Sequence, residues 1–236
     1  MENVNAVLLN ELMLFETGEA VETLKKCGIT EGMTVLDMGC GFGQWSYPAA
    51  IIVGPKGRVI AVDSEKEAKN VLEHVADRAK TYKLENITCL KPSASALYKY
   101  TDSVDFIMLY DVFHSIYNYG KKDWGVRTKD RFVDSLAALL KSGGILSFAA
   151  FSEIDYKLAP KLMKNGKYCM SPTPITHTEA VQPYLSFFKE SGLKLSNVVE
   201  NGGVHFDFMY MPNDDYGDIK VSSLERRNIY NFTKSK

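Results

Sequence analysis

The hydrophobic residues of this chain occur as short apolar runs that alternate with longer stretches of helical periodicity. The apolar runs predict strands at residues 33–37, 58–63, 87–90, 104–110 and 145–151. The longer stretches predict helices at residues 4–27, 44–53, 65–84, 129–140 and 177–191. Because strands and helices alternate, we expect a parallel sheet that is covered by helices on both faces.

The pattern changes towards the C-terminus. Residues 192–199 and 204–211 each read as a strand, and Asn201-Gly202-Gly203 stands between them. Asn-Gly between two alternating runs is a strong signal for a tight hairpin. We therefore expect a late antiparallel hairpin at residues 192–212, followed by a tail at residues 213–236.

Composition and charge narrow the class of protein. The 236 residues are 45% hydrophobic and 24% charged, with a formal net charge of −1, which is ordinary for one soluble domain. The balance of charge argues against a nucleic-acid partner, because such surfaces normally carry a basic excess. No segment is apolar enough to span a bilayer, and we expect no secretory signal. The four cysteines lack metal-binding spacing, so we expect no metal site and reduced thiols in a cytoplasmic protein.

The most specific feature is a glycine-rich turn after the first predicted strand. Gly39, Gly41 and Gly43 follow an apolar run that ends in Asp37. Glycine has no Cβ, so it adopts positive φ and lets a ligand lie against bare backbone. Asp63 ends the second predicted strand about 20 residues further on, where a carboxylate can accept hydrogen bonds from both ribose hydroxyls. These residues predict a nucleoside site, although Asp63 could instead cap the next helix.

The spacing also indicates which nucleoside is bound. A dinucleotide fold usually has G-x-G-x-x-G, whereas the third glycine here comes one position early and Gln44 takes its usual place. Asp37 would face a phosphate with negative charge, and it suits an ammonium group better. A nicotinamide-dependent oxidoreductase is therefore disfavoured.

The sequence Val-Leu-Asp-Met-Gly-Cys-Gly-Phe-Gly at residues 35–43 resembles the first motif of the class I S-adenosylmethionine-dependent methyltransferases. The chain is similar to their broad small-molecule, ubiquinone/menaquinone-type group over about residues 30–212. The resemblance implies an α/β fold with a Rossmann-like, doubly wound, seven-stranded and mostly parallel sheet. It implies one methyltransferase domain, divided into an N-terminal helical cap (1–29), a cofactor-binding core (30–151), a substrate lid (152–191), a closing β-hairpin (192–212) and a tail (213–236).

The resemblance also assigns residues to the site. The candidate cofactor-binding residues are Asp37, Gly39, Cys40, Gly41, Gly43, Asp63, Ser64, Ser93, Ala94 and Tyr110. Ser93 stands where the family often has an acid that accepts from the adenine amino group, so this contact falls to Ser93, to Ser95 or to the backbone. Cys40 could equally be a small packing residue. Asp111 and His114 follow the fourth predicted strand and are the candidate catalytic bases, or else a helix cap and a packed core side chain.

The function implied by the resemblance is methyl transfer from S-adenosylmethionine to a small-molecule acceptor by in-line displacement, with S-adenosylhomocysteine as product. We expect a cytoplasmic enzyme without a membrane partner, either a monomer or a homodimer. Two alternatives stay open: an RNA or protein methyltransferase on the same fold, and a nonenzymatic module that only binds the cofactor. The chain lacks the D-P-P-Y and N-P-P-Y signatures of amino-directed nucleic-acid enzymes.

Overall fold

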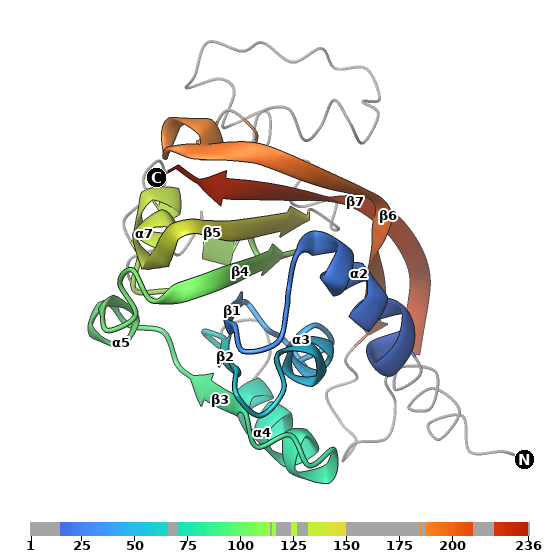
Figure 1. Ribbon diagram of the computed structural model, residues 1–236. Helices are drawn as coiled ribbons and strands as arrows, with labels where there is room; N and C mark the ends of the chain where they lie inside the picture. Colours follow the sequence, from blue (N-terminus) through green and yellow to red (C-terminus); the bar gives the residue numbers. More distant parts are fainter. Residues whose placement is uncertain are drawn as a thin grey trace, which may run out of the picture.

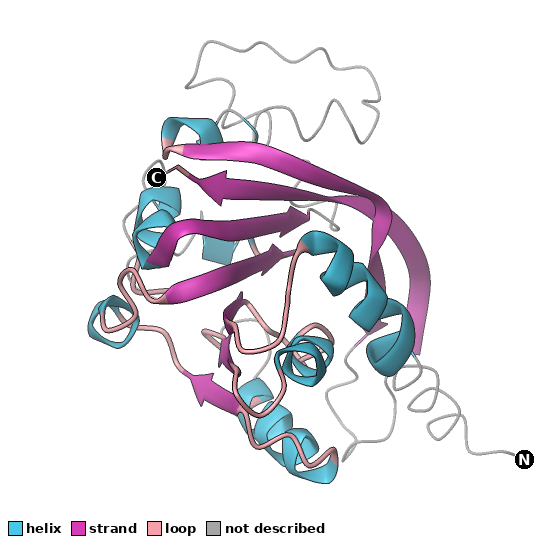
Figure 2. Ribbon diagram, viewed as in Figure 1, coloured by secondary structure: helices cyan, strands magenta, loops and turns pink. Residues whose placement is uncertain are grey.

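The structure is a computed structural model, which describes residues 15–65, 70–113, 115–116, 124–126, 132–149, 185, 187–209 and 220–235. Its strands form one twisted sheet in the order β3-β2-β1-β4-β5-β7-β6 (Figures 1 and 2). The strands are β1 (Thr34–Met38), β2 (Arg58–Val62), β3 (Ile87–Leu90), β4 (Val104–Tyr110), β5 (Leu140–Ala149), β6 (Leu193–Met209) and β7 (Lys220–Lys234). The helices are η1 (Phe15–Glu19), α2 (Ala20–Cys27), α3 (Ser46–Val53), α4 (Val71–Thr81), α5 (Ala94–Tyr98) and α7 (Phe132–Leu139).

The pairing of the strands confirms the predicted fold class. Strands β1 to β5 pair in parallel, and β7 pairs antiparallel with both β5 and β6. The sheet is therefore seven-stranded and mostly parallel, with an antiparallel hairpin at its end. No helix among the described residues is long and apolar enough to cross a membrane.

The central strands β1, β2 and β4 bury side chains on both faces of the sheet, because successive residues point to opposite sides. On one face, Val35 packs in a cluster with Leu24 of α2 and Ala49 of α3. On the other face, Leu36 belongs to a cluster that includes Phe132 of α7. Helices α2, α3 and α4 lie on one side of the sheet, and α5 and α7 lie on the other (Figure 1). Burial on both faces explains why the central strands are continuous apolar runs.

The late hairpin lies elsewhere in the chain than we expected. Residues 201–203 do not form its turn, because they lie inside β6, where the register against β7 shifts between Val199 and Gly203. A Cβ on Gly202 would lie 2.5 Å from Val199 Cγ1 and 3.2 Å from Thr23 Cγ2, so this glycine lets the strand pass close to α2. The Asn-Gly-Gly sequence is a bulge in a long strand.

The expected tail at residues 213–236 is likewise wrong, since residues 220–234 form β7 between β5 and β6. Tyr230 and Phe232 are buried there, and Phe232 lies 4.5 Å from Phe188 between ring centroids. A tail would leave these aromatic side chains in water, whereas pairing with β5 places them in the core. Most of the expected lid at 152–191 and the first 14 residues of the expected cap lie outside the described residues.

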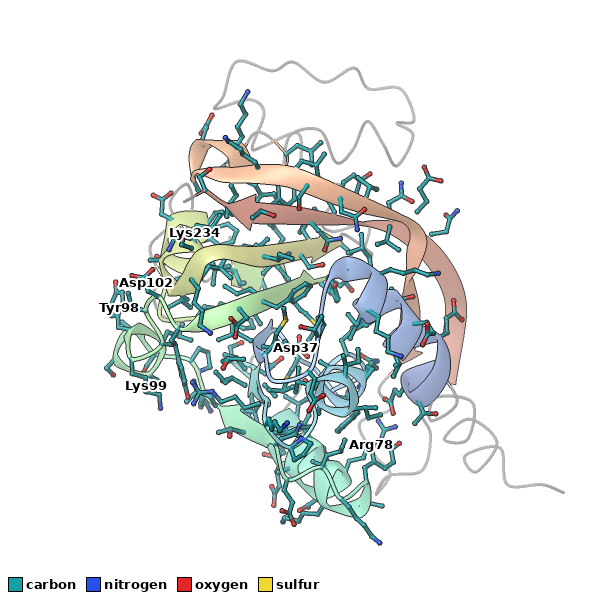
Figure 3. The ribbon with its side chains drawn as sticks, viewed as in Figure 1. Asp37, Arg78, Tyr98, Lys99, Asp102 and Lys234 are labelled. Atoms are coloured by element: carbon teal, nitrogen blue, oxygen red, sulfur yellow. The ribbon has the colours of Figure 1, made fainter. Side chains whose placement is uncertain are left out.

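A buried cluster of charged and aromatic side chains joins the N-terminal segment to α4. The side chain of Glu16 is fully buried, and Arg78 Nη2 donates to its Oε2 over 2.7 Å. The hydroxyl of Tyr82 donates to the same oxygen over 3.2 Å, and the Arg78 guanidinium carbon lies 4.7 Å from the ring centroid of Tyr47 (Figure 3). Burial raises the pKa of Glu16 to about 7, although Arg78 and Tyr82 oppose this rise.

Candidate cofactor-binding site

The glycine-rich turn lies at the carboxyl end of β1 and leads into α3. The N–H groups of Gly39 and Cys40 both donate to the carbonyl of Val62, over 2.8 and 3.0 Å, and so fasten the turn to the end of β2. The N–H of Gly43 then donates to the carbonyl of Cys40 over 2.8 Å. Gly39, Gly41 and Gly43 have φ values of 81°, 49° and 85°, in the left-handed region that favours glycine. The sequence motif thus forms the tight turn that it predicts.

The three glycines face different surroundings. A Cβ on Gly39 would lie 2.2 Å from Val112 Cγ2, and a Cβ on Gly43 would lie 2.7 Å from Tyr47 Cζ. A Cβ on Gly41 would meet no atom within 4 Å. Gly39 and Gly43 therefore let the turn pack against the protein, while Gly41 borders open space. The bare backbone at Gly41 is the part of the turn against which a ligand can lie.

Asp63 lies directly beside Gly41, as the spacing predicts. Its Oδ2 accepts from the N–H of Gly41 over 3.1 Å, and its Oδ1 accepts from the N–H of Glu65 over 2.8 Å. The two backbone donors orient the carboxylate beside the open side of Gly41. Ser64 follows and is partly buried. Asp63 does not cap α4, which begins at Val71.

Asp37 is the second carboxylate of the site and lies on β1, in the middle of the sheet (Figure 3). Its side chain is 3% exposed, and Ser46 Oγ donates to its Oδ2 over 2.6 Å. The pKa of Asp37 is raised to about 7, chiefly by burial; the hydrogen bond from Ser46 opposes this rise, and the charge of Asp63 contributes to it. Two carboxylates that disfavour each other's charge make a place where a ligand cation is stabilised.

Cys40 is buried within the turn. Burial raises the pKa of its thiol well above the ordinary value, and the nearby carboxylates of Asp37 and Asp63 add to this effect. The thiol is therefore neutral, and it packs in a small cluster with Tyr47 and Ala61. This arrangement agrees with the packing role for Cys40.

Ser93 and Ala94 lie at the start of α5. The Oγ of Ser93 caps this helix by accepting from the N–H of Ala96 over 3.1 Å, and the side chain is exposed. The backbone of Gly125 lies directly on this segment, since a Cβ on Gly125 would lie 2.2 Å from Ser93 C and 2.4 Å from Ala94 N. Sequence reasoning missed Gly125, and its only local signal was a glycine in an otherwise undefined stretch.

Two of the candidate residues at the end of β4, Tyr110 and Asp111, lie within the described part of the chain. Tyr110 turns its ring inward, 5.1 Å from the indole of Trp45 between centroids, and its hydroxyl forms a 2.6 Å hydrogen bond with Ser147 Oγ. Only its backbone therefore borders the carboxyl edge of the sheet. The N–H of Asp111 donates to the carbonyl of Ala149 over 3.0 Å, and Asp111 has a φ of 52°. His114 lies outside the described residues.

The structure thus brings Asp37, the glycine turn and Asp63 together at the carboxyl edge of β1 and β2. In open α/β sheets, ligands bind at this edge. Within the described ranges, no three His, Cys, Asp or Glu side chains are grouped so that they could hold a metal ion. The arrangement suits an organic ligand that carries a diol and a cation.

Comparisons with known proteins identify the family of this chain. A family described as a methyltransferase domain matches residues 29–203. The chain is 36% identical over 76 residues to a demethylmenaquinone methyltransferase of Lactococcus lactis subsp. lactis (strain IL1403), covering 32% of this chain and 29% of that protein. It is 38% identical over 74 residues to a probable cobalt-precorrin-6B C(15)-methyltransferase (decarboxylating) of Saccharolobus solfataricus, covering 31% of this chain and 36% of that protein. The matches thus span about a third of these curated relatives.

A solved structure shows the same fold over nearly the whole chain. A SAM-dependent methyltransferase from Aquifex aeolicus superposes with a TM-score of 0.59 at 20% identity, covering 93% of this chain and 92% of that one. The family match includes the glycine turn, both aspartates and most of the sheet. Because it extends over most of the chain, this protein belongs to the methyltransferase domain family.

Proposed function

We propose that this protein transfers a methyl group from S-adenosylmethionine to a small-molecule acceptor and releases S-adenosylhomocysteine. One observation carries the proposal: the Asp63 carboxylate is held by the N–H of Gly41, beside the one glycine of the turn that borders open space. A ribose fits this position because its two hydroxyls can donate to the two oxygens of Asp63. The methionine ammonium group of the cofactor fits the buried carboxylate of Asp37.

In this proposal, the residues of the chain bind the cofactor and orient it towards the acceptor. The cofactor supplies an activated methyl group on a sulfonium, which the acceptor displaces in line. Asp63 and Gly41 hold the adenosyl part, and Ser64, Ser93 and Ala94 border its adenine side. Holding the acceptor, methyl carbon and sulfur in line lowers the barrier by several kcal/mol (about 7–11 for well-oriented reactants). A base is needed only where the acceptor loses a proton, and Asp111 and His114 are the candidates by position.

The acceptor class follows from the family and the charge of the chain. The curated relatives methylate a menaquinone precursor and a corrin precursor, as their names state, and both are small organic molecules. The net charge of −1 is not the basic excess that RNA-binding proteins normally carry. We therefore place the acceptor among small molecules of the quinone type, acted on in the cytoplasm by a monomer or homodimer.

Calorimetric titration with S-adenosylmethionine and with NAD, side by side, tests the cofactor. We expect binding of S-adenosylmethionine only, and weaker binding in Asp63→Ala. Binding of NAD without S-adenosylmethionine would contradict the proposal.

A mass-spectrometric search for methylated products, using lysate metabolites and quinones as acceptors, then tests the reaction. Tight cofactor binding without turnover of any acceptor would favour a nonenzymatic module, and methylation of RNA would favour the other alternative.

A further inference from the structure

Ser46 has a contact that the proposed reaction does not yet use. It is the first residue of α3, its side chain is fully buried, and its Oγ lies 2.6 Å from Asp37 Oδ2. In the described part of the chain, no other donor lies within hydrogen-bond distance of the Asp37 carboxylate. The sheet and the helix that follows the glycine turn are thus joined by one hydroxyl at the candidate ammonium position.

The surroundings of Asp37 disfavour its charge. A carboxylate that is removed from water loses its hydration, and only hydrogen-bond donors or cations can offset this free-energy cost. The titratable groups that face Asp37 among the described residues are the Asp63 carboxylate, the Cys40 thiol and the Tyr110 phenol, and none of them is a cation. The hydroxyl of Ser46 is therefore the group that opposes protonation of Asp37 when no ligand is bound.

We infer that Ser46 is a positioning residue that holds Asp37 in its charged form and aims it at the ammonium group of the cofactor; this rests on the proposed function. A serine hydroxyl that donates to Oδ2 occupies one oxygen and fixes the plane of the carboxylate. The other oxygen then faces the ligand as a charged acceptor. A protonated Asp37 would be a poor partner for an ammonium group, because the charge-assisted bond is lost.

The inference predicts how cofactor affinity depends on pH. Burial raises the pKa of Asp37 to about 7, so the empty site holds a mixture of charged and neutral Asp37 near neutral pH. A ligand that needs the charged form then binds about tenfold more weakly for each pH unit below this value. Removing the hydroxyl of Ser46 should move this transition to higher pH, since the opposing hydrogen bond is lost.

The test compares S-adenosylhomocysteine with 5′-methylthioadenosine, which has the same adenosyl thioether but no ammonium group. Both are titrated calorimetrically into the wild type, Ser46→Ala and Ser46→Thr from about pH 5.5 to 8. In Ser46→Ala we expect affinity for S-adenosylhomocysteine to fall about tenfold or more near neutral pH, with the transition shifted upwards. Affinity for methylthioadenosine should stay unchanged, and Ser46→Thr, which keeps the hydroxyl, should restore the wild-type profile.

Two further measurements keep the inference testable. Ser103→Ala is the matched control, because that hydroxyl donates to the carbonyl of Tyr100 over 2.7 Å in the turn before β4. A carboxyl-carbon NMR titration of Asp37 in the cofactor-free protein should show a higher midpoint in Ser46→Ala, and Ser46→Cys, which keeps the volume, should match it. An unchanged midpoint would overturn the inference, as would an equal loss of both ligands in a folded variant. Failure of the wild type to bind either ligand would instead contradict the proposed function.

Discussion

Two alanine substitutions in the glycine turn should have different effects: one should mainly lower stability, and the other should mainly lower cofactor affinity. Gly39 and Gly41 both have left-handed φ values, so an alanine at either position is destabilising by about 1–2 kcal/mol. At Gly39 the added methyl group would also lie 2.2 Å from Cγ2 and 2.5 Å from Cβ of Val112, a buried residue. Such overlap in a packed core adds about 1–3 kcal/mol. At Gly41 the methyl group meets no atom within 4 Å.

We therefore expect Gly39→Ala to lower the free energy of unfolding by roughly 2–5 kcal/mol and Gly41→Ala by about 1–2 kcal/mol. In a chain of this length each kcal/mol lowers the melting temperature by about 2–4 °C. Gly41→Ala should nevertheless lose cofactor affinity about tenfold or more, because its methyl group occupies the open space where the ligand lies. Gly41→Val should abolish binding.

Urea unfolding measures the first quantity, and calorimetric titration with S-adenosylmethionine measures the second. Equal destabilisation by the two alanines would show that the contact of Gly39 with Val112 does not limit packing. Wild-type affinity in Gly41→Ala would show that the open face of the turn is not the cofactor's, and this result would refute the assignment of the site.

Three other predictions rest on the carboxylates. Asp63→Ala should weaken cofactor binding by about 1–3 kcal/mol, through loss of its charge-assisted bonds. Asp37→Asn should make the cofactor-free protein more stable, by about 2–4 kcal/mol near pH 8. The pKa of Asp37 is about 7 in the folded state and 3.8 in the unfolded state, so the wild type loses stability as the pH rises between these values, and the asparagine variant does not. Glu16→Gln should flatten the decline of stability between pH 4.5 and about 7, by up to about 1.4 kcal/mol per pH unit, for the same reason.

Each of these predictions has a control. Asp102 lies at the opposite edge of the sheet and pairs with Lys234 over 2.8 Å, so Asp102→Ala should leave cofactor affinity unchanged (Figure 3). Glu22 is exposed, and its hydrogen bond with Lys25 lowers the pKa of its carboxyl, so Glu22→Gln should leave the decline of stability between pH 4.5 and about 7 as it is. Equal affinity in Asp63→Ala would mean that its carboxylate does not bind the ribose. An Asp37→Asn variant that is less stable than the wild type at pH 8 would contradict the effect assigned to the burial of Asp37. If stability declined with pH as steeply in Glu16→Gln as in the wild type, the effect assigned to the burial of Glu16 would be contradicted.

Local signals in the sequence were sufficient for the first half of the fold. Strand β4 matches its predicted range because a doubly covered strand must be apolar at every position. The glycine turn was predictable because only glycine adopts its φ values without strain, and Asp63 because its distance from the turn is fixed by one helix and one strand. The match with the methyltransferase domain family confirms the resemblance that rests on these residues.

Contacts between distant segments were beyond the reach of such signals. Asn201-Gly202-Gly203 has the sequence of a turn, but pairing with β7 keeps it within β6. Strand β7 itself has a weak pattern, and it becomes a strand because its backbone pairs with β5 and β6 while Tyr230 and Phe232 enter the core. The same holds for Glu16 and Arg78, which are 62 positions apart and meet only when the N-terminal segment packs on α4.

The sequence by itself determined the α/β class, the glycine turn and the two aspartates, since these depend on residue type, periodicity and short spacings along one chain. The tertiary structure alone decided that Gly41 borders open space while Gly39 and Gly43 are packed, that the ring of Tyr110 turns inward, and that Ser46 meets Asp37. The physical reason is that the direction of a side chain and the room around it depend on which elements pack beside it, and this packing is not encoded in any local stretch of residues.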